Sequence, residues 1–295
     1  MFLSVKDLLQ HCHREKKEIW EIMLEQEAAV MEKSPDEILE DMEQKLIVME
    51  ESISRGIHGV YSYSGLTGGG AKKMLEYAKS GKALTGDVFL RTITAAVAVN
   101  EVNASMGIIC ATPTAGSAGV VPAVLFGCRE RLHLSREDQR RYLLTAGAFG
   151  LCIGNQASLA GAEGGCQAEI GSASAMAAAA LVWAAGGSPE MSADALALAL
   201  MNILGLICDP VAGLVEIPCI KRNAMGAANA LAAAELILGG TGSEIPADDA
   251  IEAMGRVGQL LPSAHRETAM GGIATTKTAL EYTKKLRRKK TEPES

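Results

Sequence analysis

Residues 173–185 (ASAMAAAALVWAA) and 224–237 (AMGAANALAAAELI) decide the fold class of this chain. Alanine has the highest intrinsic helix propensity, and alternating runs of β-branched and aromatic residues, which would indicate strands, are nearly absent from the sequence. A helix that is apolar on every side must be buried. The sequence therefore predicts an all-α fold, a buried bundle of Gly- and Ala-rich helices with irregular loops that form the functional site.

Helix starts outside these two runs support the same prediction. Ser34, Pro35 and Glu37 combine an N-cap, a proline at the first helical position and a capping-box glutamate, and apolar residues follow at spacings of three and four. The same logic applies to three further starts: Ser4 with Asp7, Ser135 with Asp138, and Pro246 with Asp248 and Asp249. Helices are therefore expected along the whole chain.

Composition suggests how the chain is divided and packed. Of the 295 residues, 48% are apolar and only 4% are aromatic, while glycine alone contributes 31, so close approach of small side chains must build the core. We expect an acidic N-terminal helical arm at 1–57, a helical body at 58–280 that holds every candidate site, and a basic disordered tail at 281–295.

The charge of the chain limits its partners. Twenty-eight basic and 35 acidic side chains give a net charge of −7, which disfavours nucleic acid as a partner. The basic tail could form an anion-binding patch, but a solvated terminus is the simpler interpretation. No apolar run reaches the roughly 20 residues that cross a bilayer, and the first residues lack the pattern of a secretory signal. We therefore expect a cytoplasmic chain with no membrane partner.

Five polar breaks rich in Gly or Pro interrupt the helical pattern, at 62–73, 111–122, 161–174, 208–227 and 260–268. Three of the seven cysteines, Cys166, Cys208 and Cys219, lie in these breaks. Iron–sulfur clusters need thiolates on irregular backbone, where free N–H groups can hydrogen-bond the sulfurs. Ordinary thiols stay an open alternative, because the spacing contains no CxxC. The other cysteines are expected to fill space in the core: Cys12, Cys110, Cys128 and Cys152.

The loop 113–119 (PTAGSAG) has the composition of an anion-binding loop. Thr114 and Ser117 offer hydroxyls, and Gly116 and Gly119 would free backbone N–H groups ahead of a helix start, which suits a carboxylate or a phosphate. No GK[ST] sequence follows, so the loop is not a Walker loop. Close helix packing explains the two glycines equally well.

His265 is the candidate base or substrate contact in the break at 260–268, and a structural histidine is the alternative. Lys72 and Lys73 could bind an anion or form a Schiff base with pyridoxal phosphate, but a solvated pair is the more common case. The residues alone therefore leave the identity of the base open.

Four blocks together resemble the iron–sulfur-dependent L-serine dehydratases (L-serine ammonia-lyases), specifically the alpha chain of the two-subunit form. They are TPTAGSAGVVPAVL at 112–125, GAEGGCQAEIGSASAMAAAAL at 161–181, CDPVAGLVEIPCIKRNAMGAANA at 208–230 and LPSAHRETAMGG at 261–272. The likeness runs from about residue 60 to 280. Ala212 departs from the family's pattern, which has a second glycine at that position.

The resemblance implies that 58–280 is a helical catalytic domain and that Cys166, Cys208 and Cys219 hold a 4Fe-4S cluster. It also implies that the loop carrying Thr114, Gly116, Ser117 and Gly119 lies near the substrate. Single-chain members of the family carry an additional N-terminal domain with an SSSHTxGP-type motif. No such motif occurs here, so a separate beta chain is the expected partner.

The reaction implied by the resemblance is the deamination of L-serine to pyruvate and ammonia. Three thiolates would leave one iron of an oxygen-sensitive cluster open, and this iron would act as a Lewis acid on the substrate hydroxyl. His265 is the best candidate on this chain for the base that removes the Cα proton, although the beta chain could supply that group. Arg266 or Lys221 could assist in binding the substrate carboxylate, and no pyridoxal phosphate is expected.

Two other classes of protein stay as alternatives. A pyridoxal-phosphate dehydratase would catalyse the same reaction through a lysine, but the chain lacks the alternating strand and helix pattern of the usual folds for that chemistry. A non-catalytic helical scaffold with a structural zinc would also explain the core and the cysteines. Absorbance of an aldimine would identify the first, and zinc without iron would identify the second.

Overall fold

The structure, a computed structural model, describes residues 1–291, with the backbone alone described for 289–291. Helices account for all the regular structure of this part of the chain, which contains no β-strand but two isolated bridges, Tyr61 with Gly68 and Cys208 with Arg266. The predicted all-α fold is confirmed. Within the same residues, no helix combines the length and the apolar character needed to cross a membrane.

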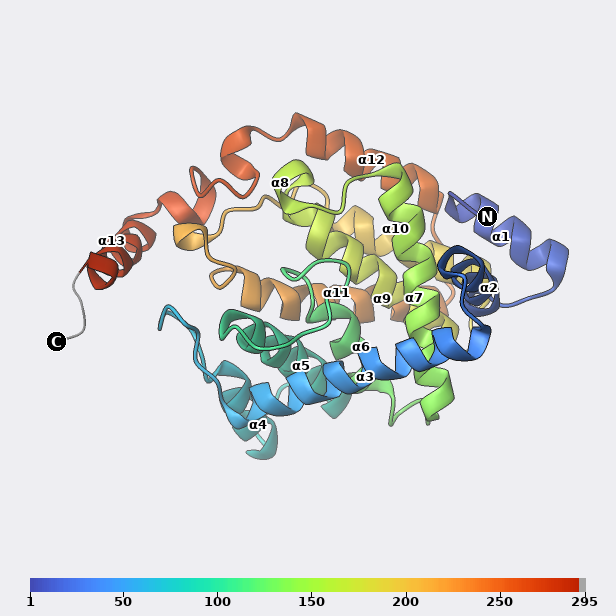
Figure 1. The fold of residues 1–295 in the computed structure, drawn as a ribbon, viewed down its shortest axis with the longest axis horizontal. Helices are drawn as coiled ribbons and strands as arrows, with labels where there is room; N and C mark the ends of the chain where they lie inside the picture. Colours follow the sequence, from blue (N-terminus) through green and yellow to red (C-terminus); the bar gives the residue numbers. More distant parts are fainter. Residues whose placement is uncertain (292–295) are drawn as a thin grey trace.

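Three N-terminal helices lie against the body rather than apart from it. They are α1 (Val5–Glu15), α2 (Ile19–Met31) and α3 (Pro35–His58), and α3 runs along one side of the molecule (Figure 1). The caps predicted at Ser4 and Ser34 are present: the Ser4 side chain accepts from the Asp7 amide, and Ser34 forms a capping box with Glu37. Buried apolar residues of all three helices belong to the same core as those of the body.

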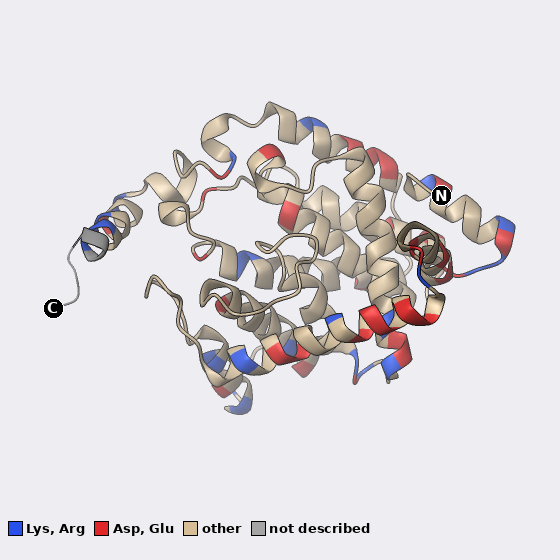
Figure 2. Cartoon of the chain, in the orientation of Figure 1, with Lys and Arg blue, Asp and Glu red and all other residues tan. Residues whose placement is uncertain are grey.

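The acidic character of the arm contributes to this attachment. Acidic residues gather on α3 (Figure 2), and two of them face the start of α7 (Arg136–Gln156) and the residue after α6 (Val120–Cys128). Arg136 pairs with Glu43 at 2.8 Å, and Arg129 pairs with Glu50 at 2.7 Å. These pairs are partly exposed, so the shared apolar core supplies most of the attachment.

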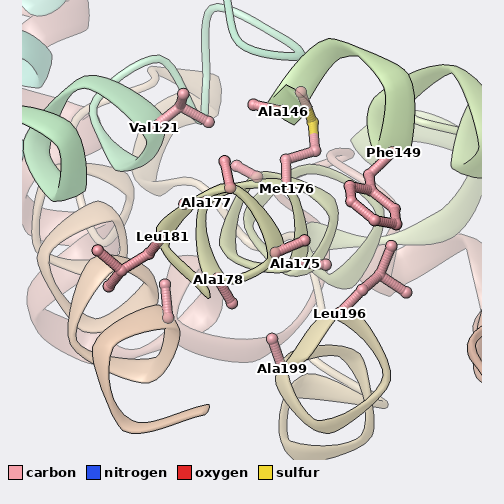
Figure 3. Close-up of a cluster of buried hydrophobic side chains, with 14 of the residues drawn as sticks. Val121, Ala146, Phe149, Ala175, Met176, Ala177, Ala178, Leu181, Leu196 and Ala199 are labelled. Atoms are coloured by element: carbon pink, nitrogen blue, oxygen red, sulfur yellow. The ribbon is translucent and has the colours of Figure 1, made fainter. Parts of the chain in front are cut away.

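Helix α9 (Ser172–Ala184), which contains most of the first alanine-rich run, lies at the centre of the bundle. It contacts α6, α7, α10 (Pro189–Ile203) and α11 (Cys219–Leu238). Figure 3 shows its small side chains between Ala146 and Phe149 of α7 on one side and Leu196 and Ala199 of α10 on the other. Small residues on every face let four helices approach one another closely, as the sequence predicts.

The remaining elements flank this centre. Helices α4 (Gly70–Lys79) and α5 (Asp87–Ala104) lie beside α3, and α12 (Ala247–Leu260) lies on α10. Between the long helices stand a short helix, α8 (Gly161–Gly164), a π-helical segment, η1 (Gln167–Gly171), and three 3₁₀ turns, η2 (Val211–Gly213), η3 (Ser263–His265) and η4 (Gly272–Thr275). The candidate site is formed by some of these irregular segments together with neighbouring loops and the first turns of α11.

The C-terminal segment differs from the sequence prediction. A disordered tail was expected at 281–295, whereas α13 (Lys277–Thr291) is helical through its whole described length and contacts η2 and η4. Thr276 accepts from the Ala279 amide and so caps the helix start, Ala279 is buried, and Lys, Arg and Leu are good helix formers. The predicted boundary therefore falls inside α13, and residues 292–295 lie outside the described residues.

Gly56→Ala should destabilise the fold by about 2–3 kcal/mol, because a Cβ at this position would lie 2.4 Å from the carbonyl oxygen of Ala98 and would force α3 away from α5. Gly147→Ala on α7 is the matched control. Its Cβ would meet only Cε of Met23 at 3.7 Å, so better helix propensity should stabilise the protein by about 0.5–1 kcal/mol. Urea denaturation measures both changes, and equal effects of the two variants would contradict the close approach.

Candidate metal and substrate site

The segment that carries Cys166 begins at a tight turn. Gly165 has φ of 76°, which favours glycine, and its added Cβ would clash with Leu261 at 2.6 Å. Cys166 follows, and η1 begins at Gln167. The Gln167 side chain donates to the Met254 carbonyl at 3.1 Å and accepts from the Gly205 amide at 2.9 Å. These bonds fix the cysteine against α12 and the end of α10.

Cys208 lies on extended backbone that pairs with the segment around His265. The Cys208 amide donates to the carbonyl of His265, and the Glu267 amide donates to the carbonyl of Cys208, both at 2.9 Å. The break at 260–268 is therefore brought directly to the break at 208–227. Ala212, a few residues further on, has φ of 56°. This left-handed conformation favours glycine, which is the physical reason for the second glycine in the family's pattern.

Cys166 and Cys208 meet in space. Ligand atoms of Cys166, Cys208 and Glu169 all lie within 4.8 Å of one another. The Cys208 thiol donates a hydrogen bond to the Cys166 sulfur, and this bond, together with the nearby Arg222 guanidinium, holds the pKa of Cys166 below its usual value. The same bond and burial raise the pKa of Cys208. These contacts favour a charged form of Cys166.

Cys219 starts α11 and lies outside the 4.8 Å group. Burial and, to a smaller extent, the negative charge of Cys166 together raise the pKa of Cys219 to about 12. The two sulfurs therefore influence each other electrostatically. The four other cysteines do not join this group, and burial is the main cause of a raised pKa at each of them: Cys12, Cys110, Cys128 and Cys152.

Arg222, on the first turns of α11, joins the cysteine segments to the C-terminal turns. Its Nη1 donates to Oδ1 of Asp209 at 2.8 Å and to the Ile207 carbonyl at 2.9 Å. Asp209 is 1% exposed, and its Oδ2 accepts from the Ile273 amide at 2.6 Å. A buried ion pair that is hydrogen-bonded on both sides therefore holds the residue next to Cys208 in place.

The loop 113–119 lies on Glu169. The Thr114 hydroxyl donates to Oε1 of Glu169 at 2.6 Å, and an added Cβ on Gly116 would lie 3.0 Å from the same oxygen. The amides of Ala115 and Gly116 donate to no acceptor among the described residues. The two amides that could bind an anion therefore lie beside the carboxylate that accompanies Cys166 and Cys208.

Ser117 and Gly119 hold the loop rather than face a ligand. Ser117 is fully buried, and its hydroxyl lies within hydrogen-bond distance of Thr114 Oγ1 and of the Thr112 carbonyl. The Gly119 amide donates to Oδ1 of Asn223 at 3.0 Å, and an added Cβ would lie 2.3 Å from Nδ2 of Asn100. Gly119 thus fits the alternative of close helix packing.

Asn223 connects the loop to Cys219. Its Nδ2 donates to the Gly116 carbonyl at 2.7 Å and to the Cys219 carbonyl at 3.0 Å, while its Oδ1 accepts from Gly119. One fully buried side chain on α11 therefore fixes the anion-binding loop relative to the third cysteine.

The backbone of His265 and Arg266 pairs with Cys208, but the two side chains point in different directions. The His265 ring packs on Gly271, whose added Cβ would lie 3.0 Å from Nε2. Arg266 donates to the Gln259 carbonyl at 2.6 Å and lines a cavity of about 490 Å³ between α7, α8 and α12, which none of the three site cysteines lines. The structure therefore brings the His265 backbone, but not the Arg266 side chain, to the thiol pair. Lys221 is exposed on α11.

Sequence reasoning missed four residues of this site: Glu169, Asp209, Arg222 and Asn223. Only Glu169 carries a usable local signal, because it is charged, lies in a Gly- and Ala-rich segment and follows Cys166 by three residues, about one helical turn. The other three act through bonds that depend on the folded arrangement.

The donor set fits an iron–sulfur cluster. Three thiols lie on irregular backbone or at a helix start, all three are buried, and one has a lowered pKa. Thiolate sulfur is the usual ligand of such clusters, and a pKa lowered by a neighbouring cation favours the ligating form. Glu169 lies within 4.8 Å of two of these thiols but is a carboxylate and does not belong to the set of sulfur donors.

Comparison with known proteins gives one consistent family. The profile of the family "Serine dehydratase alpha chain" matches residues 14–274. The chain is 54% identical to the "Probable L-serine dehydratase, alpha chain" of Bacillus subtilis, over 97% of this chain and 95% of that protein. It is 41% identical to the "L-serine dehydratase, alpha chain" of Peptoniphilus asaccharolyticus, over 94% and 96%.

A longer relative shows the same likeness over part of its length. The chain is 38% identical to the "L-serine dehydratase" of Streptomyces coelicolor, over 92% of this chain but 60% of that protein. The profile match covers most of the chain, and the first two relatives are matched over nearly their whole length. The chain therefore belongs to the serine dehydratase alpha chain family.

Proposed function

We propose that this chain is the alpha chain of an iron–sulfur-dependent L-serine dehydratase, which converts L-serine to pyruvate and ammonia together with a beta chain. The observation that carries the proposal is the meeting of Cys166, Cys208 and Glu169 with the loop 113–119 at one place. The relatives named L-serine dehydratase support the substrate. The 40% of the Streptomyces protein that this chain does not cover supports a second chain.

Cys166, Cys208 and Cys219 would hold a 4Fe-4S cluster. When bound, such a cluster would offer one iron without a protein thiolate as a Lewis acid for the hydroxyl that leaves the substrate. Arg222 stabilises the thiolate of Cys166, and the Asp209 pair keeps the Cys208 segment in position. These residues prepare the sulfur ligands, and no pyridoxal phosphate is required.

The loop would bind the substrate carboxylate. The free amides of Ala115 and Gly116 would donate to it, Thr114 lies beside them, and Ser117 and Gly119 would keep the loop in shape. Arg266 would reach the carboxylate only by giving up its bond to Gln259. His265, whose backbone pairs with Cys208, is the proposed base on this chain for the Cα proton.

Anaerobic purification of the alpha chain with its co-expressed beta chain tests the proposal. We expect about four irons and four sulfides per alpha chain, brown absorbance, and formation of pyruvate from L-serine that is lost in air and recovered with iron and reductant. Zinc without iron, an aldimine absorbance band, or turnover that is indifferent to oxygen would contradict it.

A further inference from the structure

The carboxylate of Glu169 is only half satisfied by the protein. Its Oε1 accepts the Thr114 hydroxyl at 2.6 Å, and no donor among the described residues bonds to Oε2. Glu169 also forms no ion pair with a described Lys, Arg or His residue. The nearby arginine, Arg222, pairs with Asp209 instead. A partly buried carboxylate therefore keeps one acceptor oxygen without a partner.

Two glycines enclose this carboxylate from opposite segments. An added Cβ on Gly161 of α8 would lie 2.6 Å from Oε2 of Glu169 and 3.3 Å from the Cys208 sulfur. An added Cβ on Gly116 would lie 3.0 Å from Oε1 and 3.2 Å from Oε2. The carboxylate thus lies between the loop amides and the thiol pair. It fits there because neither glycine has a side chain that would occupy the same space.

The charges that face Glu169 would favour a cation beside it. Glu267 is the charged group that acts on it most, and its negative charge raises the pKa of Glu169 in addition to the larger effect of burial, while the Thr114 hydroxyl opposes both. Glu267 and Glu169 are both acids, and no basic side chain among the described residues forms an ion pair with Glu169. A ligand that brings a positive charge would relieve this repulsion.

We propose that Glu169 binds the α-ammonium group of the substrate and so selects α-amino acids over α-hydroxy acids of the same shape. The inference rests on the proposed function of the same site. An α-amino acid carries its ammonium and carboxylate groups on one carbon, so their binding groups must be neighbours. Oε2 of Glu169 and the amide-bearing Gly116 meet this requirement. Glu169 would be a specificity-determining residue that touches the substrate.

The test compares two ligands that differ only at the α-substituent, L-serine and L-glycerate, on the anaerobic alpha–beta enzyme. Glu169→Gln keeps the size of the side chain and its bond from Thr114 but removes the charge. We expect KM for L-serine to rise by about 10- to 100-fold, and the dissociation constant of L-glycerate, measured by calorimetry, to stay within about 3-fold. Iron per alpha chain should not change. Glu169→Asp, which restores the charge, should give an intermediate KM.

Glu163→Gln is the matched control, because Glu163 lies six residues earlier on α8, is exposed and accepts from Ser158. Glu163→Gln should change neither KM for L-serine nor the dissociation constant of L-glycerate. Equal weakening of both ligands by Glu169→Gln, unchanged affinity for L-serine, or loss of iron would each overturn the inference. In all three cases the wild-type enzyme would still turn over L-serine. Absence of iron and of turnover in the wild-type enzyme would instead contradict the proposed function.

Discussion

Cys208→Ser should remove iron from the alpha chain and lower turnover of L-serine by at least about 1,000-fold. Cys208 lies at the meeting point of the site, since its thiol hydrogen-bonds the Cys166 sulfur and its backbone pairs with both His265 and Glu267. A serine hydroxyl is not ionised near neutral pH and is a poor ligand for iron in a sulfur-rich site. Loss of a Lewis acid removes several kcal/mol of transition-state stabilisation, and each 1.4 kcal/mol is a factor of ten.

Iron analysis, absorbance and pyruvate formation on anaerobic protein measure this effect. Cys110→Ser is the control, because Cys110 is partly exposed and does not join the group of Cys166, Cys208 and Glu169. It should keep both iron and turnover. If Cys208→Ser kept its full iron content and turnover, Cys208 would not be a ligand of the cluster. The proposal that Cys166 and Cys208 hold the cluster together would then be wrong.

Asp209→Ala should lower the free energy of unfolding by about 4 kcal/mol. The variant leaves the Arg222 guanidinium, which is 16% exposed, without its partner, and it also removes the acceptor of the Ile273 amide. Breaking a buried ion pair by removing one partner typically costs 3–5 kcal/mol, because the remaining charge is uncompensated. Since Asp209 follows Cys208 directly, iron should also be retained less well by the folded protein.

Urea denaturation of the wild type and the variant measures the loss of stability. Asp41→Ala, which breaks an exposed pair with Lys33, is the matched control and should not change the free energy of unfolding measurably. Asp209→Asn should be intermediate, because the amide keeps one acceptor oxygen. An Asp209→Ala protein as stable as the Asp41→Ala protein would show that the pair does not stabilise the fold.

The helices were predictable because their signals are local. Ser34 with Glu37 and the alanine-rich run at 173–185 depend on residues within a few positions of one another, and both appear as expected, in the cap of α3 and in α9. The tail at 281–295 was not predicted correctly up to Thr291. Charge and position at the terminus indicated disorder there, whereas a cap at Thr276 and burial of Ala279 support α13.

The candidate site was predictable only in its parts. The three cysteines and the loop 113–119 stand out because each interrupts a helical pattern. The function of Gly119 could not be read in this way, since a glycine that frees an amide and a glycine that lets helices approach look alike in sequence. Asn223, which accepts from the Gly119 amide, decides between the two, and it lies 104 residues away along the chain.

The sequence by itself determined the helical class, the helix starts, the segments where chemistry could occur and the family to which the chain belongs. Only the tertiary structure decided which polar atoms meet. Thr114 and Glu169 are 55 residues apart, and Asn223 and Gly116 are 107 apart. Helix propensity and capping act over a single turn, whereas contacts between distant segments form only when buried faces pack together. Glu169 therefore acquires its position between the loop and the thiols from the packed fold.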